Sequence, residues 1–196
     1  GYLELCVIAE ELGRSLAPVP FSSSVYLATE AIKSWGTEPQ KQHYLPKLAA
    51  GELIGTLAMN EGLGSPSVAM RIVDGRVSGN KIPVPDGDIA DFTVLTARDD
   101  NDNVGLYLVD LADTAIKREV LASMDPSRSQ ARITFDSAPA QALDEAGETQ
   151  LTELLDRAAV LLAFEQIGGC QAALDMGIAY TKERYAFGRP IASFQA

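Results

Sequence analysis

The first fifty residues carry apolar side chains at helical spacing. Over about 1–16 they recur every three or four positions with acidic residues between them, which predicts an amphipathic helix. A Pro- and Ser-rich break then leads to a second helix, which Ser23 or Ser24 is expected to cap. Thr37 and Gln40 form a capping-box pattern that predicts a third helix.

The pattern changes at Gly51 to short runs of β-branched residues. The clearest runs are 71–77, 92–97, 104–109 and 131–135. Hairpin turns are indicated at Asp74-Gly75 and Asp86-Gly87, because these pairs adopt the positive φ angles that tight turns need. The middle of the chain is therefore predicted to be an antiparallel, β-barrel-like domain.

A long helical pattern covers about 149–185, which at ~1.5 Å per residue would extend roughly 50 Å. No second long helix follows to cover its apolar positions, so we expect contact with another subunit or with further sequence. Because the chain opens without Met and stops at Ala196, where we expect a new helix to begin, we expect a piece of a longer protein. The predicted fold class is α+β, with domains at 1–50, 51–140 and 149–196.

The charge of the chain argues against nucleic acid as a partner. Its 27 acidic and 16 basic residues give a formal net charge of -11, which repels a phosphate backbone. No apolar run is long enough to span a membrane and no signal peptide is recognisable, so a cytoplasmic protein is expected. Cys6 and Cys170 are expected to be reduced core thiols, and His43, the only histidine, has no neighbours at metal-ligand spacing.

The run YTKERYAFGRPIASFQ, residues 180–195, resembles the turn between the first two long helices of the C-terminal bundle in acyl-CoA dehydrogenases. The order of helices, β domain and long helix also resembles that family. The resemblance implies a truncated four-helix bundle, an FAD cofactor, an acyl-CoA thioester substrate and an acceptor of the electron-transfer flavoprotein type. It also implies a homo- or hetero-oligomer formed through the long helix.

In the family this turn serves the flavin of the neighbouring subunit, which makes Arg184, Phe187, Phe194 and Gln195 candidate FAD-binding residues. The fork of donors on Arg184 suits a pyrophosphate, and the two aromatic rings suit the rest of a dinucleotide. The alternative is that Arg184 pairs with a nearby carboxylate and the turn only ends a helix.

A second resemblance, over residues 8–14, 40–48 and 51–61, leads to the family's Thr-Glu-Pro-Gly-x-Gly-Ser loop, which faces the flavin ring. Here residues 60–65 read NEGLGS, so Asn60 replaces the threonine and the proline is missing. The resemblance implies that Asn60, Gly64 and Ser65 contact FAD and that Ser65 also lies near the thioester.

A third resemblance lies at Ser78 to Ile82, after which the family places Trp-Ile-Thr or Trp-Ile-Ser beside the flavin. This chain has Pro83-Val84-Pro85 instead, which removes two backbone donors, an aromatic wall and a hydroxyl. Asp156 matches a substrate-side aspartate, but the arginine expected one turn later is Ala159.

No catalytic residue is assigned within the chain. The family's usual base is a glutamate further along the bundle, beyond Ala196, and a variant position corresponds to Ala158. Glu165 is a further candidate for the base, although a weaker one. It lies among apolar neighbours, where burial would raise the pKa of its carboxyl.

Three functions remain open from the sequence. The first is an FAD-dependent acyl-CoA dehydrogenase. The second is a non-catalytic partner subunit that completes a neighbour's flavin site, since the departures at Asn60 and at 83–85 fall in the half that would hold this subunit's own flavin. The third is an acyl-CoA-binding module without redox chemistry.

Overall fold

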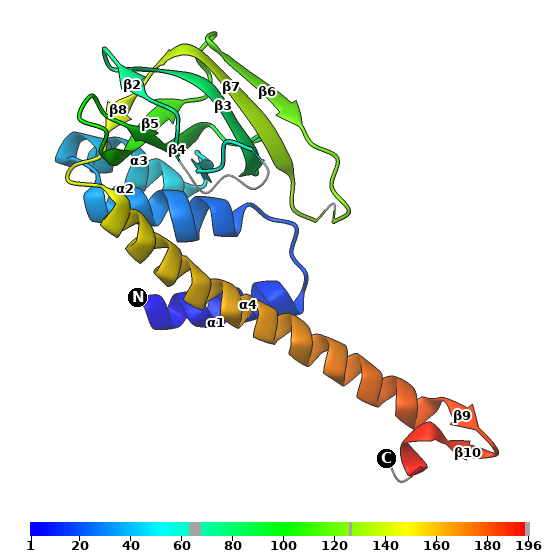
Figure 1. Cartoon of the computed structure of the whole chain (residues 1–196). Coiled ribbons are helices and arrows are strands. Elements are labelled where there is room, and N and C mark those ends of the chain that lie inside the picture. Colours follow the sequence, from blue (N-terminus) through cyan, green and yellow to red (C-terminus); the bar gives the residue numbers. More distant parts are fainter. Residues whose placement is uncertain (63–67, 126, 195–196) are drawn as a thin grey trace. The chain divides into compact units, whose positions relative to one another are not determined.

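A computed structural model describes residues 1–62, 68–125 and 127–194. The chain forms two compact units, Pro18–Ala158 and a smaller one made of Gly1–Ala17 with Ala159–Ala196. Helix α4, Glu148–Glu183, contributes to both units (Figure 1). Its length agrees with the long helix expected from the sequence, whereas the division into three domains stays a prediction.

The helices of the larger unit begin with the π-helix η1, Ser22–Thr29, which continues directly into α2, Glu30–Trp35. Helix α3, Glu38–Ala50, has the predicted capping box: Gln40 N donates to Thr37 Oγ1 and Thr37 N donates to Gln40 Oε1. The cap expected from Ser23 or Ser24 was wrong, because η1 has no side-chain cap. The Ser23 hydroxyl donates to Asp86 Oδ2 at 2.5 Å, and Ser24 Oγ accepts from Gly55 N, so both hydroxyls have buried partners far away in the chain.

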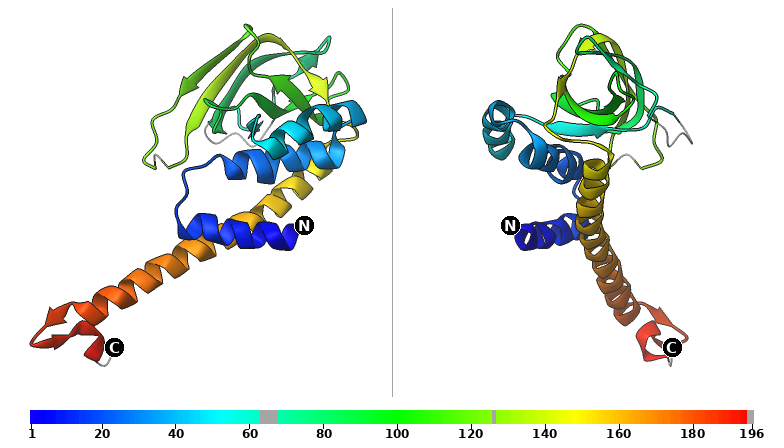
Figure 2. Two further views of the ribbon diagram at one scale, coloured as in Figure 1. Left: turned by 180° about the vertical axis from the view of Figure 1, so that it is seen from behind. Right: turned by 60° about the vertical axis from the view of Figure 1, so that its left-hand side comes forward.

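Two four-stranded sheets make up the β portion of the larger unit (Figure 2). The first has the order β1-β4-β5-β8, with bounds β1 Gly55–Ala58, β4 Phe92–Arg98, β5 Val104–Asp110 and β8 Gln141–Ala142. The second has the order β2-β3-β7-β6, with bounds β2 Ile72–Val73, β3 Arg76–Pro85, β7 Gln130–Pro139 and β6 Ile116–Val120. The sheets are not closed into a barrel, and β1 pairs with β4 in parallel although the other pairs are antiparallel. The mixed α+β fold is confirmed.

Local sequence accounts for some strand boundaries and not for others. The run predicted over 71–77 is a hairpin, because Asp74 and Gly75 both have positive φ, 50° and 69°, between β2 and β3. Strand β6 was not predicted, since Lys117, Arg118 and Glu119 interrupt its apolar pattern. This strand lies at the edge of its sheet, where solvent reaches those charged side chains.

The core of the larger unit lies on both faces of β4. Leu95 and Ala97 belong to an apolar cluster between the two sheets, together with Ile133 and Phe135 of β7. The alternate positions of β4 belong to a second cluster, which includes residues of α2 and the first part of α4. Alternation along a strand thus lets β4 join the sheets to the helices.

The smaller unit is built on a close crossing of α1, Tyr2–Arg14, and α4. A Cβ built on Gly13 would lie 1.7 Å from the Glu165 carbonyl oxygen, and one built on Gly168 would lie 1.8 Å from that of Glu10. Arg14 also pairs with Asp175 at 2.9 Å. The two glycines therefore allow the helix backbones to touch.

The end of the smaller unit is a tight hairpin of β9, Tyr185–Ala186, and β10, Arg189–Pro190, followed by the 3-10 helix η2, Ile191–Ser193.

Several large apolar side chains of α4 in this unit are exposed. They are Val160, Leu162, Ile167, Leu174, Met176 and Ile178. Their exposure agrees with the expected oligomer contact through α4, which stays a prediction. No helix of the described chain is long and apolar enough to cross a membrane.

The crossing of α1 and α4 predicts opposite effects for two alanine substitutions. Gly168→Ala should lower the free energy of unfolding by about 2 kcal/mol, because the new methyl group would overlap the backbone of α1. The matched control is Gly177→Ala, on the same helix with nothing within 4 Å of a new Cβ, which should raise it by roughly 0.5–1 kcal/mol. Urea unfolding measures both, and equal effects from the two variants would contradict the crossing.

Candidate functional site

The segment after β1 and the end of β3 lie side by side. Ile82 N donates to the Asn60 carbonyl at 2.7 Å, and Glu61 and Ile82 form a parallel β-bridge. Thr56 Oγ1 of β1 donates to the Pro85 carbonyl at 2.5 Å. Two segments that the resemblance placed at the flavin ring, Asn60 and 83–85, are thus brought together by backbone contacts.

The side chains of these segments differ in what they present to solvent. Asn60 is exposed and Pro83 and Pro85 are half-buried. Val84 is 0 % exposed and packs in the cluster between the sheets, which leaves its backbone alone for any contact with a flavin. Gly64 and Ser65 lie outside the described residues.

A buried ion pair lies directly behind these segments and was not identified from the sequence as a site. Lys81 Nζ donates to Glu61 Oε1 at 2.8 Å, to the Met59 carbonyl at 3.0 Å and to Thr96 Oγ1 at 3.1 Å. Lys81 is 0 % exposed, and burial lowers the pKa of its ammonium although Glu61 acts in the opposite direction. The signal in the sequence was the two-residue period of β3, which places Lys81 on the same face as the buried Val77.

Hydroxyl groups of the π-helix η1 form hydrogen bonds that attach this helix to the sheets, close to Pro85. Asp86, almost fully buried, accepts hydrogen bonds from Ser23 at 2.5 Å and Ser129 at 3.3 Å. Ser24 Oγ accepts from Gly55 N at 3.2 Å. The contacts of Asp86 hold the C-terminal end of the segment Pro83 to Pro85, since Asp86 follows it directly.

The first part of α4 places Asp156 on an exposed face. The neighbouring Arg157 donates to Glu30 at 2.6 Å and lies 6.0 Å from the centre of the Trp35 ring, so it anchors the helix. Ala158, the variant base position, is a buried residue of α4 without an ionisable side chain.

The hairpin at the end of the smaller unit gathers three of the predicted FAD-binding residues. Arg184 is exposed, and within the described chain its guanidinium makes no hydrogen bond or ion pair. Phe187, 97 % exposed at positive φ, contacts Phe194 edge-on with ring centres 6.3 Å apart. Arg189, missed from the sequence, lies 3.8 Å above the Phe194 ring and orients it. Gln195 lies outside the described residues.

Glu165, the weaker base candidate, is half-buried in α4 at the crossing with α1. Its backbone carbonyl faces Gly13, so this position serves the packing of the two helices. No group of three or more potential metal ligands occurs among the described residues.

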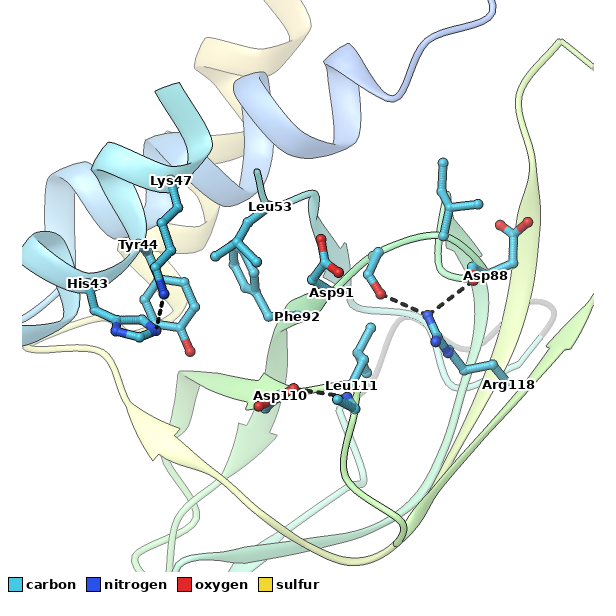
Figure 3. A pocket seen from close by; sticks show the side chains of 13 residues that line it. His43, Tyr44, Lys47, Leu53, Asp88, Asp91, Phe92, Asp110, Leu111 and Arg118 are labelled. Atoms are coloured by element: carbon cyan, nitrogen blue, oxygen red, sulfur yellow. Dashed lines mark hydrogen bonds between the residues drawn. The ribbon is translucent and has the colours of Figure 1, made fainter. Parts of the chain in front are cut away.

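A cavity of about 380 Å³ lies elsewhere in the larger unit, between α3 and the ends of β4 and β5 (Figure 3). His43, Tyr44 and Lys47 line it from α3, with Lys47 Nζ 3.5 Å from His43 Nε2. Burial raises the pKa of Tyr44, and the charge of Asp110 adds to this effect. None of the residues predicted from the sequence to bind FAD or substrate lines this cavity.

Family models match both ends of the chain. Residues 1–52 match the acyl-CoA dehydrogenase N-terminal domain, and residues 145–196 match the acyl-CoA dehydrogenase C-terminal domain. The chain belongs to the acyl-CoA dehydrogenase family. The predicted recognition is confirmed.

Relatives and solved structures agree with this assignment. The chain is 32% identical over 217 residues to the mitochondrial isovaleryl-CoA dehydrogenase of Solanum tuberosum, covering 100% of this chain and 52% of that protein. It is 33% identical to the acyl-CoA dehydrogenase IpdE2 of Mycolicibacterium smegmatis, covering 98% and 49%. The structure of the ChsE4-ChsE5 complex from Mycobacterium tuberculosis is similar with a TM-score of 0.86 at 26% identity, covering 99% of this chain and 54% of that one. The chain spans about half the length of the curated relatives it matches.

Acyl-CoA dehydrogenases are FAD-dependent. The residues that converge beside β1 fit a flavin in kind: the exposed amide of Asn60 offers both donors and an acceptor, and the half-buried rings of Pro83 and Pro85 offer apolar surface. The exposed guanidinium of Arg184 fits a pyrophosphate. The residues predicted to bind FAD thus lie in two groups, one in each compact unit.

The buried Lys81 predicts a specific dependence of stability on pH. Because its pKa is lower in the folded chain than in the unfolded chain, the unfolded chain binds more protons below the ordinary lysine value of 10.5. The contribution of Lys81 to the free energy of unfolding should therefore rise as pH increases toward 10.5. The difference in unfolding free energy between wild type and Lys81→Met, measured by urea titration from pH 7 to pH 10, should increase in favour of the wild type. A difference that is constant over this range would contradict the burial of a charged Lys81.

Proposed function

We propose that the protein of which this chain forms part is an FAD-dependent acyl-CoA dehydrogenase, which introduces a double bond between the α and β carbons of an acyl-CoA thioester. The observation that carries the proposal is the hydrogen bond between Ile82 N and the Asn60 carbonyl, which joins two sequence-distant segments that the family uses at one flavin ring.

The proposed cofactor contacts rest on the family resemblance, and the geometry within each unit is compatible with them. Asn60, Pro83, Pro85 and the backbone of Val84 would lie on the ring side, together with Gly64. Arg184, Phe187 and Phe194, with Gln195, would serve the dinucleotide of a neighbouring subunit. When bound, FAD accepts the hydride from the β carbon of the substrate.

On the substrate side, we propose that Ser65 and Asp156 contact the thioester substrate. The reaction also needs a catalytic base, and neither residue supplies it. The base must remove a proton from the α carbon, which requires a carboxylate within hydrogen-bond reach. Glu165 lies where α1 and α4 cross, with its backbone against Gly13, and Ala158 has no ionisable group. We propose that a glutamate beyond Ala196 has this role, as in the family. A cytoplasmic location and an acceptor of the electron-transfer flavoprotein type complete the proposal.

One observation favours a second function, that of a partner subunit in a heteromeric acyl-CoA dehydrogenase. The departures from the family, Asn60 and Pro83 to Pro85, fall in the group that would face this subunit's own flavin, whereas the hairpin with Arg184 keeps the family pattern. Two similar structures each carry a pair of protein designations. They are the Tcur3481-Tcur3483 steroid ACAD, at 32% identity and a TM-score of 0.85, and the ChsE4-ChsE5 complex. Their agreement supports a hetero-oligomer as the alternative. An acyl-CoA-binding module without redox chemistry is the third possibility.

The first experiment measures the visible flavin absorbance of the full-length protein purified alone, with FAD quantified after denaturation. We expect close to one FAD per chain, since the ring-side backbone is in place despite the two prolines. A folded but colourless protein would reject the catalytic proposal for this subunit in favour of the partner role.

The hairpin predicts an effect across a subunit interface. Arg184→Ala should weaken FAD binding by the whole oligomer roughly ten- to hundredfold, because each charge-assisted hydrogen bond to a phosphate contributes about 1.5–3 kcal/mol. Lys182→Ala, which removes an exposed charge two residues earlier, is the control and should leave the dissociation constant unchanged. Titration of the FAD-free oligomer with FAD measures both constants, and equal values for the two variants would contradict the assigned role.

A further inference from the structure

The burial of Lys81 costs free energy, and an apolar side chain could occupy the same position in the core. Its ammonium is completely removed from solvent and donates to three acceptors, which uses all three of its N–H bonds. Replacing a buried ion pair by apolar residues of similar size is often neutral or stabilising. Packing alone therefore does not explain why a charged residue occupies this position. The hydrogen-bond partners of Lys81 indicate another role.

The three acceptors lie on separate pieces of the chain. The Met59 carbonyl comes just after β1, Thr96 belongs to β4, and Glu61 lies in the segment that follows Asn60. Glu61 in turn accepts hydrogen bonds from Ala69 N at 3.0 Å and from Met70 N at 3.0 Å. Lys81 thus connects β3 to both ends of the stretch between Glu61 and Met70.

The sheet itself does not hold β3 regularly at this place. The β3–β7 ladder has a register shift between Lys81 and Val84, which is where the sequence turns to Pro83-Val84-Pro85. Pro83 and Pro85 also have no N–H to contribute. The hydrogen bonds that hold this part of β3 beside β1 and Asn60 are those of Ile82 N to the Asn60 carbonyl, of Thr56 Oγ1 to the Pro85 carbonyl, and the three bonds of Lys81.

We propose that Lys81 is a positioning residue for the flavin-ring side of the site, which it serves by holding Asn60 and the Pro83–Pro85 segment in one fixed geometry through Glu61, Met59 and Thr96. The inference rests on the proposed function, because it assumes that these two segments contact FAD. This role also explains how the flavin site could keep a defined shape without the family's aromatic side chain and hydroxyl. The charge of Lys81 would hold the backbone of these segments in place without contacting the cofactor.

The test separates positioning from simple stability with three variants of the full-length protein. Lys81→Met leaves Glu61 with an unpaired charge, so it should both lower the melting temperature and weaken FAD binding. The double variant Lys81→Met/Glu61→Gln removes that charge while the amide still accepts from the backbone of Ala69 and Met70. Lys117→Met, on exposed edge strand β6, is the matched control.

The dissociation constant of FAD is measured by fluorescence titration of the FAD-free protein, well below its melting temperature, beside a thermal unfolding curve. We expect the double variant to recover most of the lost melting temperature but to bind FAD about tenfold more weakly than wild type, the equivalent of one lost hydrogen bond to the cofactor. A double variant that recovers FAD affinity together with stability would overturn the positioning role. A wild type that binds no FAD at all would overturn the proposed function and this inference with it, whereas tight wild-type binding with unchanged variants would overturn the inference alone.

Discussion

The architecture of the larger unit depends on a buried charge at the junction of its two sheets. Lys81 lies in the second sheet, whereas Thr96 belongs to the first and Met59 follows directly after β1, so the ammonium joins the two sheets where no ladder connects them. A buried ammonium is tolerated only when its donors are satisfied, and here each of them has an acceptor. This requirement ties the path of the chain after β1 to the register of β3, and with it the ring-side half of the candidate site.

The central strand β4 provides the apolar counterpart of this junction. Its alternate side chains enter two clusters, one between the sheets and one toward the helices, so that neither layer packs without it. Specific hydrogen bonds also attach the helices to the rest of the unit, among them those of Asp86 with Ser23 and of Arg157 with Glu30. The candidate site is therefore attached to a rigid support, while its own surface is made of two prolines and an exposed asparagine.

The residues that would serve FAD are divided between the two compact units, and the division coincides with the pattern of departures from the family. The hairpin in the smaller unit presents Arg184 and the Phe187–Phe194 pair, with Arg189 stacked on the second ring. The larger unit would present the ring side, where the side chains depart from the family pattern and Ile82 N bonds to the Asn60 carbonyl. A protein that kept its own flavin and one that completes a neighbour's would place different demands on these two groups, which is why the state of the cofactor distinguishes the two functions.

The sequence alone determined the features that follow from neighbours along the chain. The capping box at Thr37, the turn at Asp74-Gly75 and the long helix α4 were all predictable, because capping, hairpin turns and helical periodicity depend on residues within a few positions of one another. The family resemblance was also present in short motifs, and the hairpin residues were named from it.

Only the tertiary structure decided how distant residues use their chemistry. Ser23 bonds to Asp86 rather than capping a helix, Val84 points into the core, and strand β6 forms at an edge despite its charges. The close approach of α1 and α4 at Gly13 and Gly168, and the burial of Lys81, equally depend on partners far away in the chain. Periodicity shows which face of an element is buried, but the identity of the atoms on the other side is set by packing, which no local pattern contains.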